Sequence, residues 1–174
     1  AGTAHVCGID VTEEPMKAKA MLGYLPEGAP AYDDMSVARF LDFIAGIRGL
    51  RGKTKSAMVA NPVEQAHLGD VLGQRIETLS KGFKRRVGLA QAIVHDPKVL
   101  ILDEPTDGLD PNQKHEVRSL IKEMAEKTQF LIVTHNRITM EIAEQLVGVT
   151  QQELGVSRIV EVDMRDIDDM ELAY

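Results

Sequence analysis

The chain has little of several residue types, and each shortage excludes a class of protein. It contains one cysteine among 174 residues, so no internal disulfide can form, and a reducing compartment fits this usage. No apolar run approaches the roughly 20 residues that a membrane-spanning helix needs. A net charge of −7 disfavours nonspecific binding of nucleic acid by overall electrostatics. The apolar content of 44% is nevertheless enough for one compact domain with a sizeable core.

Two kinds of ligand-binding motif are also missing. No set of histidines and Cys7 has the spacing of a zinc site, and we expect Cys7 to be a buried structural thiol. The pattern Gly-x-x-x-x-Gly-Lys-Ser/Thr, whose backbone amides and lysine hold nucleotide phosphates, does not occur. The nearest segment is 46–54, but Ile47 stands where the first glycine of the pattern is needed. This segment follows an amphipathic helical pattern, so we predict a basic connection between two helices.

Strand and helix patterns alternate along the chain as in a βα protein. We expect a short strand, a helix and a second apolar segment at residues 5–9, 12–20 and 22–25. A helical insert is predicted from about Met35 to His95. Ser36 is a reasonable N-cap for its first helix, and Asn61-Pro62 is expected to interrupt the next.

Paired carboxylates follow the most apolar run of the chain. Residues 99–102 read Val-Leu-Ile-Leu, which is typical of a strand buried on both faces of a parallel sheet. Asp103 and Glu104 come next, at the end of the strand where α/β sheets bind ligands. Unpaired buried carboxylates are costly, so we expect a divalent cation or a strong donor nearby. Residues 128–134 predict an adjacent parallel strand, reached through a helix that begins at Pro111.

A second candidate site lies upstream, where Ser80, Lys81 and Gly82 precede a helix. Free backbone amides and the helix dipole at this N-terminus favour an anion such as a phosphate group. Gly82 permits close approach of the backbone. The basic residues that follow, Lys84, Arg85 and Arg86, are expected to form a solvated helix face.

Taken together, these segments resemble the nucleotide-binding domain of ATP-binding-cassette (ABC) proteins. The matching motifs are the Q-loop (23–27, with Glu27 in place of glutamine), the signature loop (79–83), the Walker B strand (99–104), the D-loop (108–110) and the switch histidine (Thr134-His135). The signature loop departs from the commonest pattern at Lys81 and Phe83 and resembles that of some exporters. The resemblance implies an α/β fold with a P-loop NTPase-like core, in which helices flank a parallel sheet, and a helical subdomain. The phosphate-loop segment is lacking.

The resemblance also implies a chemistry, which is phosphoryl transfer from ATP to water with Mg²⁺. Asp103 would hold the metal through water, and Glu104 would orient or deprotonate the attacking water. His135 would contact the γ-phosphate. Glu27 would contact the metal and the nucleotide and would link this site to the helical subdomain. The remaining expected nucleotide contacts are Ser80, Lys81, Gly82 and Asp110. Because catalysis of this kind is mostly positioning, a chain without the phosphate loop is expected to be inactive alone.

The organisation implied is a partial ABC domain over residues 1–174, truncated before the phosphate loop. It comprises a helical subdomain at 28–95, a core at 96–162 and a tail at 163–174. The expected role is that of the ATP-binding subunit of a transporter, paired with a second nucleotide-binding domain and a transmembrane permease. Such a subunit lies in the cytoplasm at the inner face of the cell membrane.

Two other functions stay open at this level. Residues 128–162 resemble the end of the head of structural-maintenance-of-chromosomes (SMC) ATPases, which would engage DNA and a second head. Residues 103–111 look instead like transporter ATPases. Coiled-coil heptads beside the head would favour the SMC alternative, and none occurs within the sequence. A noncatalytic remnant that supplies only its signature loop is the third possibility, and the transported substrate and its direction are not encoded in these motifs.

Overall fold

A computed structural model describes residues 2–29, 31–153 and 155–164. The chain forms two compact units, Ala1–Thr134 and His135–Tyr174. The sequence-based boundaries at residues 28, 96 and 163 stay predictions, and most of the predicted tail lies outside the described residues.

The first unit is built on a parallel sheet of three strands in the order β3-β4-β5. These strands are β3 (Leu22–Leu25), β4 (Val99–Asp103) and β5 (Gln129–Val133). Leu25 pairs with Leu102, and Asp103 pairs with Val133. The carboxyl ends of the three strands therefore meet at one edge. This confirms the predicted parallel pairing of the two apolar runs and the α/β fold class.

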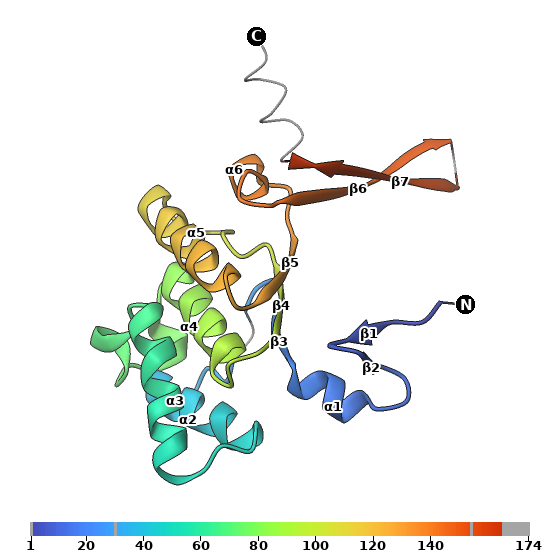
Figure 1. Ribbon diagram of the computed structural model, residues 1–174. Helices are drawn as coiled ribbons and strands as arrows, with labels where there is room; N and C mark the ends of the chain where they lie inside the picture. The colour runs from blue at the N-terminus through green and yellow to red at the C-terminus, as the bar shows by residue number, and fades with distance from the viewer. Residues whose placement is uncertain (1, 30, 154, 165–174) are drawn as a thin grey trace. The chain divides into compact units, whose positions relative to one another are not determined.

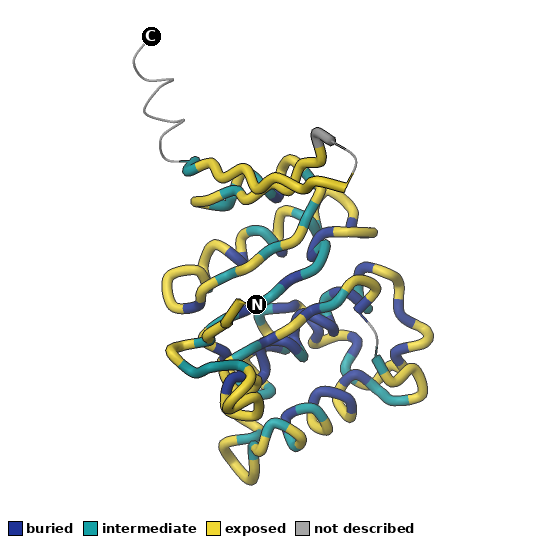
Figure 2. Tube along the Cα trace, turned by 90° about the vertical axis from the view of Figure 1, so that its right-hand side faces the viewer, coloured by how far each residue is buried: buried dark blue, intermediate teal, exposed yellow. Residues whose placement is uncertain are grey.

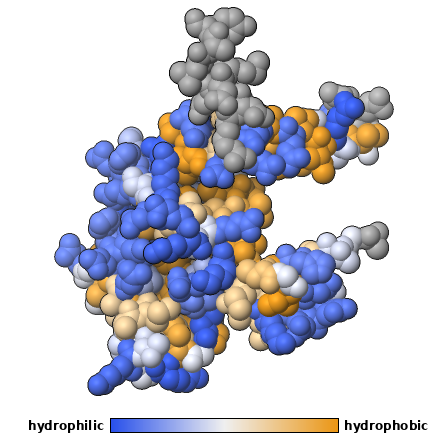
Figure 3. Space-filling model, viewed as in Figure 1, coloured by the Kyte–Doolittle hydropathy of each residue, from blue (hydrophilic) through white to orange (hydrophobic). Residues whose placement is uncertain are grey.

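One face of this sheet carries the core of the first unit. Leu100 and Leu102 are fully buried, and Figure 1 shows α4 (Lys81–Ile93) and α5 (Pro111–Ala125) on one side of the sheet. On the other side Tyr24, Leu131 and Val133 are each at least half exposed. Hydrophobic surface accordingly gathers over β4 and β5 (Figure 3). Residues 99–102 were expected to be buried on both faces. Instead, Leu100 and Leu102 are buried on one face, and Val99 and Ile101 are only half-buried on the other.

The helical insert forms the second part of the same unit. It contains α2 (Val37–Ile47), α3 (Gly52–Gln65), the short 3₁₀ turns η1 (Gly69–Val71) and η2 (Ile76–Thr78), and α4. The Ser36 hydroxyl caps α2 by accepting from the Arg39 amide at 3.4 Å. Side chains from these elements share one hydrophobic cluster that includes Val37, Phe40, Leu41, Leu68, Ile76 and Val87. The segment 46–54 joins α2 to α3, as predicted, and does not follow a strand.

Asn61-Pro62 does not interrupt α3, contrary to expectation. Pro62 lies inside the helix and is buried. The helix ends only three residues later, at Gln65, so a single missing amide donor near its end is tolerated. The Ala66 amide still donates to the Pro62 carbonyl at 3.0 Å.

The N-terminal residues also differ from the predicted single strand. They form a hairpin of β1 (His5–Val6) and β2 (Ile9–Asp10), followed by α1 (Pro15–Ala20). Cys7 and Gly8 both have positive φ, 51° and 79°, which is the geometry of a two-residue hairpin turn. Cys7 is exposed, so the prediction of a buried thiol was wrong.

The second unit contains a short helix, α6 (Arg137–Met140), and a hairpin of β6 (Gln145–Glu153) and β7 (Val156–Asp163). The two strands are antiparallel, with Val149 opposite Ile159. Both strands are largely exposed (Figure 2).

Candidate functional site

The predicted catalytic carboxylates lie at the carboxyl edge of the sheet. Asp103 ends β4 and Glu104 follows it, while Glu27 lies two residues beyond the end of β3. The Glu104 amide donates to the Val133 carbonyl at 2.9 Å. The Thr134 hydroxyl donates to Glu104 Oε2 at 3.0 Å. These bonds fix the Glu104 side chain beside the end of β5.

The backbone at Glu104 has an uncommon conformation. Its φ of 46° lies in the left-handed region, which residues with a Cβ rarely adopt. The Asp107 amide donates to the Glu104 carbonyl at 3.0 Å and closes a tight turn after the strand. Strained backbone of this kind persists only where the surroundings hold it, and it is concentrated at functional sites.

Arg85 of α4 contacts this turn, and sequence reasoning missed it. Its side chain is 5% exposed, although the sequence predicted a solvated basic face. Nη1 donates to the Pro26 carbonyl at 2.8 Å, Nε donates to the Pro105 carbonyl at 3.4 Å, and Nη2 contacts the carbonyls of Asp103 and Glu104. The signal that could have revealed it is helical spacing, because buried Leu89 and Ala92 lie four and seven residues further along the same helix.

Charge surrounds the Arg85 guanidinium. Burial lowers its pKa, while the carboxylates of Asp107, Asp103, Glu104 and Glu27 act in the opposite direction. An arginine keeps its proton in proteins, so this group stays a buried cation among acidic side chains. The neighbouring Arg86 differs, since it pairs with Glu116 and lies over the Phe83 ring at 5.6 Å.

The N-terminus of α4 carries the signature-loop residues. The Ser80 hydroxyl caps the helix by accepting from the Phe83 amide at 3.3 Å. Gly82 is buried, and an added Cβ would lie 2.4 Å from Oε1 of Gln113, so the close approach it permits here is that of α5. Lys81 is exposed, with Nζ 4.0 Å from an Asp107 carboxylate oxygen. An exposed pair at that distance contributes little to stability.

Two further candidates have clear local positions. Asp110 is the N-cap of α5 and accepts from the Gln113 amide at 2.9 Å, with Pro111 at the first helical position. His135 is the first residue of the second unit and is exposed. The contacts of both residues with a nucleotide stay predictions.

The acidic residues at the sheet edge can be compared with the ligands that Mg²⁺ prefers. Within residues 2–29, 31–153 and 155–164, no group of three or more His, Cys, Asp or Glu side chains is arranged to hold one. Mg²⁺ is commonly held by one or two carboxylates together with substrate phosphates and water. Asp103 and Glu104 therefore fit Mg²⁺ that arrives with a nucleotide.

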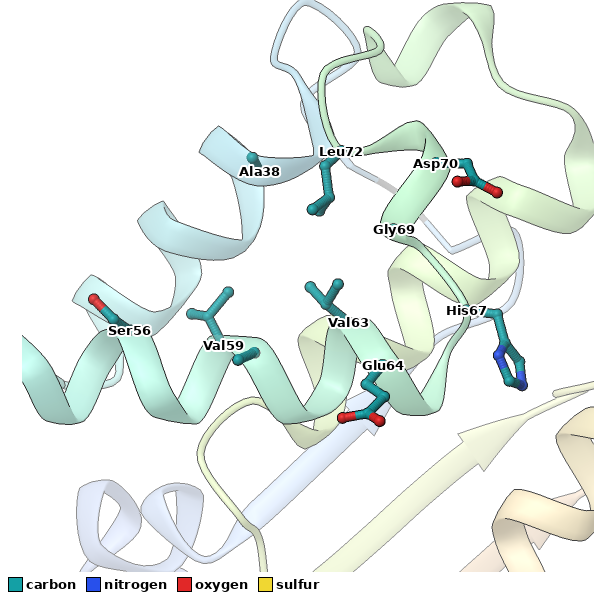
Figure 4. Close-up of a pocket in the computed structure, with 10 residues that line it drawn as sticks. Ala38, Ser56, Val59, Val63, Glu64, His67, Gly69, Asp70 and Leu72 are labelled. Atoms are coloured by element: carbon teal, nitrogen blue, oxygen red, sulfur yellow. The ribbon is translucent and has the colours of Figure 1, made fainter.

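Two cavities of the first unit lie elsewhere. One of about 650 Å³ lies between α2, α3 and η1, where Val59, Val63 and Leu72 form its apolar wall (Figure 4). Another of about 940 Å³ is lined by residues such as Met16, Ile47 and His95. None of the candidate site residues lines either cavity. Among the helices that the structure describes, none has the length and apolar character needed to cross a membrane.

Comparison with known proteins identifies the family. The family model described as "ABC transporter" matches residues 1–107. The chain belongs to the ABC transporter family. Members of this family hydrolyse ATP. The match confirms the resemblance to an ABC nucleotide-binding domain that the sequence motifs indicated.

Curated relatives support the same assignment. The chain is 35% identical over 133 residues to the probable multidrug ABC transporter ATP-binding protein YbhF of Escherichia coli, covering 76% of this chain and 23% of the relative. It is 37% identical over 150 residues to the Nod factor export ATP-binding protein I of Burkholderia orbicola, covering 84% of this chain and 47% of the relative. The chain thus spans less than half the length of either relative. These relatives favour the transporter assignment over the SMC alternative.

Solved structures confirm the fold. The ATP-binding subunit of an ABC transporter superposes with a TM-score of 0.80 at 23% identity, covering 98% of this chain and 70% of that structure. A dimeric ATP-binding cassette, MJ0796, bound to ADP and Pi superposes with a TM-score of 0.76 at 17% identity, covering 84% of this chain and 68% of that structure. At these identities the likeness establishes the architecture alone.

Proposed function

We propose that this chain is part of an ABC transporter subunit in which ATP binding and hydrolysis drive a membrane partner. The observation that carries the proposal is the meeting of Asp103, Glu104 and Thr134 at one edge of the parallel sheet. Ligands of α/β sheets bind beyond this edge. The names of the relatives, which describe a multidrug transporter and an exporter, point to export.

The roles of the acidic residues follow from their positions. Asp103 would hold Mg²⁺ through water, and Glu27 would be the second contact at the same edge. Glu104, held by Thr134, would orient or deprotonate the attacking water, and His135 would contact the γ-phosphate. Bound Mg²⁺ neutralises charge that develops on the phosphate oxygens.

The N-terminus of α4 would serve a nucleotide held by a second nucleotide-binding domain. Ser80, Lys81 and the amides near Gly82 lie where a helix favours an anion. Asp110 would act near the same nucleotide while it caps α5. A permease would place the assembly at the cytoplasmic face of the membrane.

These 174 residues contain no phosphate-loop pattern, so on their own we expect them to hydrolyse ATP at background rate. Robust Mg²⁺-dependent turnover that Glu104→Gln abolishes would show that the chain completes a site by itself.

The decisive experiment mixes this chain with an intact relative whose catalytic glutamate is changed to glutamine. Sedimentation velocity is expected to show a heterodimer that depends on ATP. Ser80→Arg places bulk and charge at the phosphate contact, so we expect its Kd to rise about tenfold, or ~1.4 kcal/mol. Glu104→Gln in this chain should change the association little.

A control separates the contact from the loss of a helix cap. Ser36→Arg removes the matched N-cap of α2, where no phosphate contact is proposed. This variant should associate as the unmodified chain does. If the Kd of association is unchanged by ATP and by Ser80→Arg, the proposed function is contradicted.

A further inference from the structure

Arg85 links α4 to two other segments of the first unit through main-chain carbonyls. It reaches Pro26 after β3, Asp103 and Glu104 at the end of β4, and Pro105 beyond them. A guanidinium carries five donors in a rigid plane, so one side chain can satisfy all of these acceptors. Lysine offers a single point charge and cannot span the same set.

These carbonyls belong to the turn that orients Glu104. The turn is held in the left-handed region at Glu104, with φ of 46°. Buried carbonyls without donors are costly, and a strained turn persists only while its surroundings hold it. Arg85 supplies donors to both carbonyls that flank this residue's backbone.

We infer that Arg85 is a positioning residue that holds the Asp103–Pro105 turn, and with it the Glu104 carboxylate, against the helix that carries the signature loop. It touches no reacting atom and acts through the backbone of Glu104. The inference rests on the proposed function only for its consequence in catalysis. The same contact links α4, whose first residues form the signature loop, to the end of β3 before Glu27.

The first test measures amide hydrogen exchange in this chain by NMR. Arg85→Gln and Arg85→Lys should speed exchange of the Glu104 and Asp107 amides, which bond to the Val133 and Glu104 carbonyls. Amides in the middle of α4 should keep their protection. Arg86→Gln is the matched control, because it removes one charge from the next residue without contacting the turn.

A second measurement needs no substitution, so it tests the inference even if the Arg85 variants fail to fold. In the unmodified chain, the two Nη groups of Arg85 should give separate, slowly exchanging NMR signals because each bonds to a different segment. Averaged Nη signals, or exchange at Glu104 and Asp107 that Arg85→Lys leaves unchanged, would overturn the inference.

The second test uses a complete ATP-binding subunit that contains this chain. A misplaced catalytic group costs about 100-fold in rate, so Arg85→Gln should lower kcat by about that factor while KM for ATP stays within a few-fold. Arg85→Lys should recover part of the loss, and Arg86→Gln should match the unmodified subunit. An unchanged kcat refutes the positioning role. A complete subunit that hydrolyses no ATP refutes the proposed function instead, and hydrogen exchange then decides the role of Arg85.

Discussion

His95 shows how a single side chain can make this fold sensitive to pH. Its Nε2 lies 2.9 Å from the Leu22 carbonyl, which ties the end of α4 to the start of β3. Its Nδ1 is buried without a hydrogen-bond partner in the described structure. Burial lowers the pKa of His95, and the nearby Arg48 lowers it further, against smaller opposing effects from the Leu22 contact and Asp96.

We predict that stability falls as pH drops below the ordinary histidine pKa of 6.5. In that range the unfolded chain binds a proton that the folded chain resists, so protonation favours unfolding. His95→Gln should flatten the dependence between pH 7.5 and 5.5, measured by urea unfolding at a series of pH values. Equal slopes for the two proteins would remove His95 as the cause.

Among the site residues, the sequence predicted correctly those whose position follows from neighbouring residues in the chain. Asp103 and Glu104 could be predicted because an apolar strand ends immediately before them. Arg85 could not be assigned a role, since its partners lie 18 to 59 residues away in the chain. The bond from Thr134 to Glu104 likewise spans 30 residues and exists only because β4 and β5 pair in register.

At the scale of elements, the contact between β3 and α4 leaves no space at Gly23. A Cβ there would lie 2.2 Å from the Ala92 carbonyl oxygen and 2.5 Å from a Leu100 methyl group. Because one of these neighbours is backbone, the strand or the helix must move to admit a side chain. Gly73 has no atom within 4 Å of the same position, so it offers a matched comparison.

Gly23→Ala is predicted to lower the free energy of unfolding by about 1–3 kcal/mol, the usual range for overpacking. Gly73→Ala should change it by less than about 0.5 kcal/mol. Urea denaturation followed by circular dichroism measures both. If the two substitutions cost the same, the close packing of β3 on α4 is not a determinant of stability.

Helix starts could be predicted from the sequence because their signals are local. Ser36 and Ser80 cap α2 and α4 through bonds to amides three residues on. The turn at Cys7 was missed because cysteine is not a typical residue for positive φ. The break at Pro62 was wrongly predicted because the destabilisation that a proline causes depends on its position within the helix. The exposed face of the sheet could not be predicted, since an apolar run does not reveal how many of its faces are covered.

At the scale of the whole chain, the two units differ in how they bury apolar side chains. The first unit buries a continuous set from the sheet and the helices. In the second unit Val147, Val149 and Ile159 are 61%, 71% and 71% exposed. Pairing places Val149 opposite Ile159, so these side chains share one face of the β6–β7 hairpin. An isolated two-stranded hairpin is at best marginally stable in water.

We therefore predict that the hairpin opens without unfolding the sheet of the first unit. In native-state hydrogen exchange, amides of β6 and β7 should exchange at low free energies that barely respond to denaturant, as local openings do. Amides of β4, such as those of Leu100 and Leu102, should exchange only near the free energy of global unfolding. Val149→Thr should leave the β4 values unchanged, because it alters the hairpin alone. Equal protection and equal denaturant dependence in both units would mean that the chain unfolds as one cooperative body.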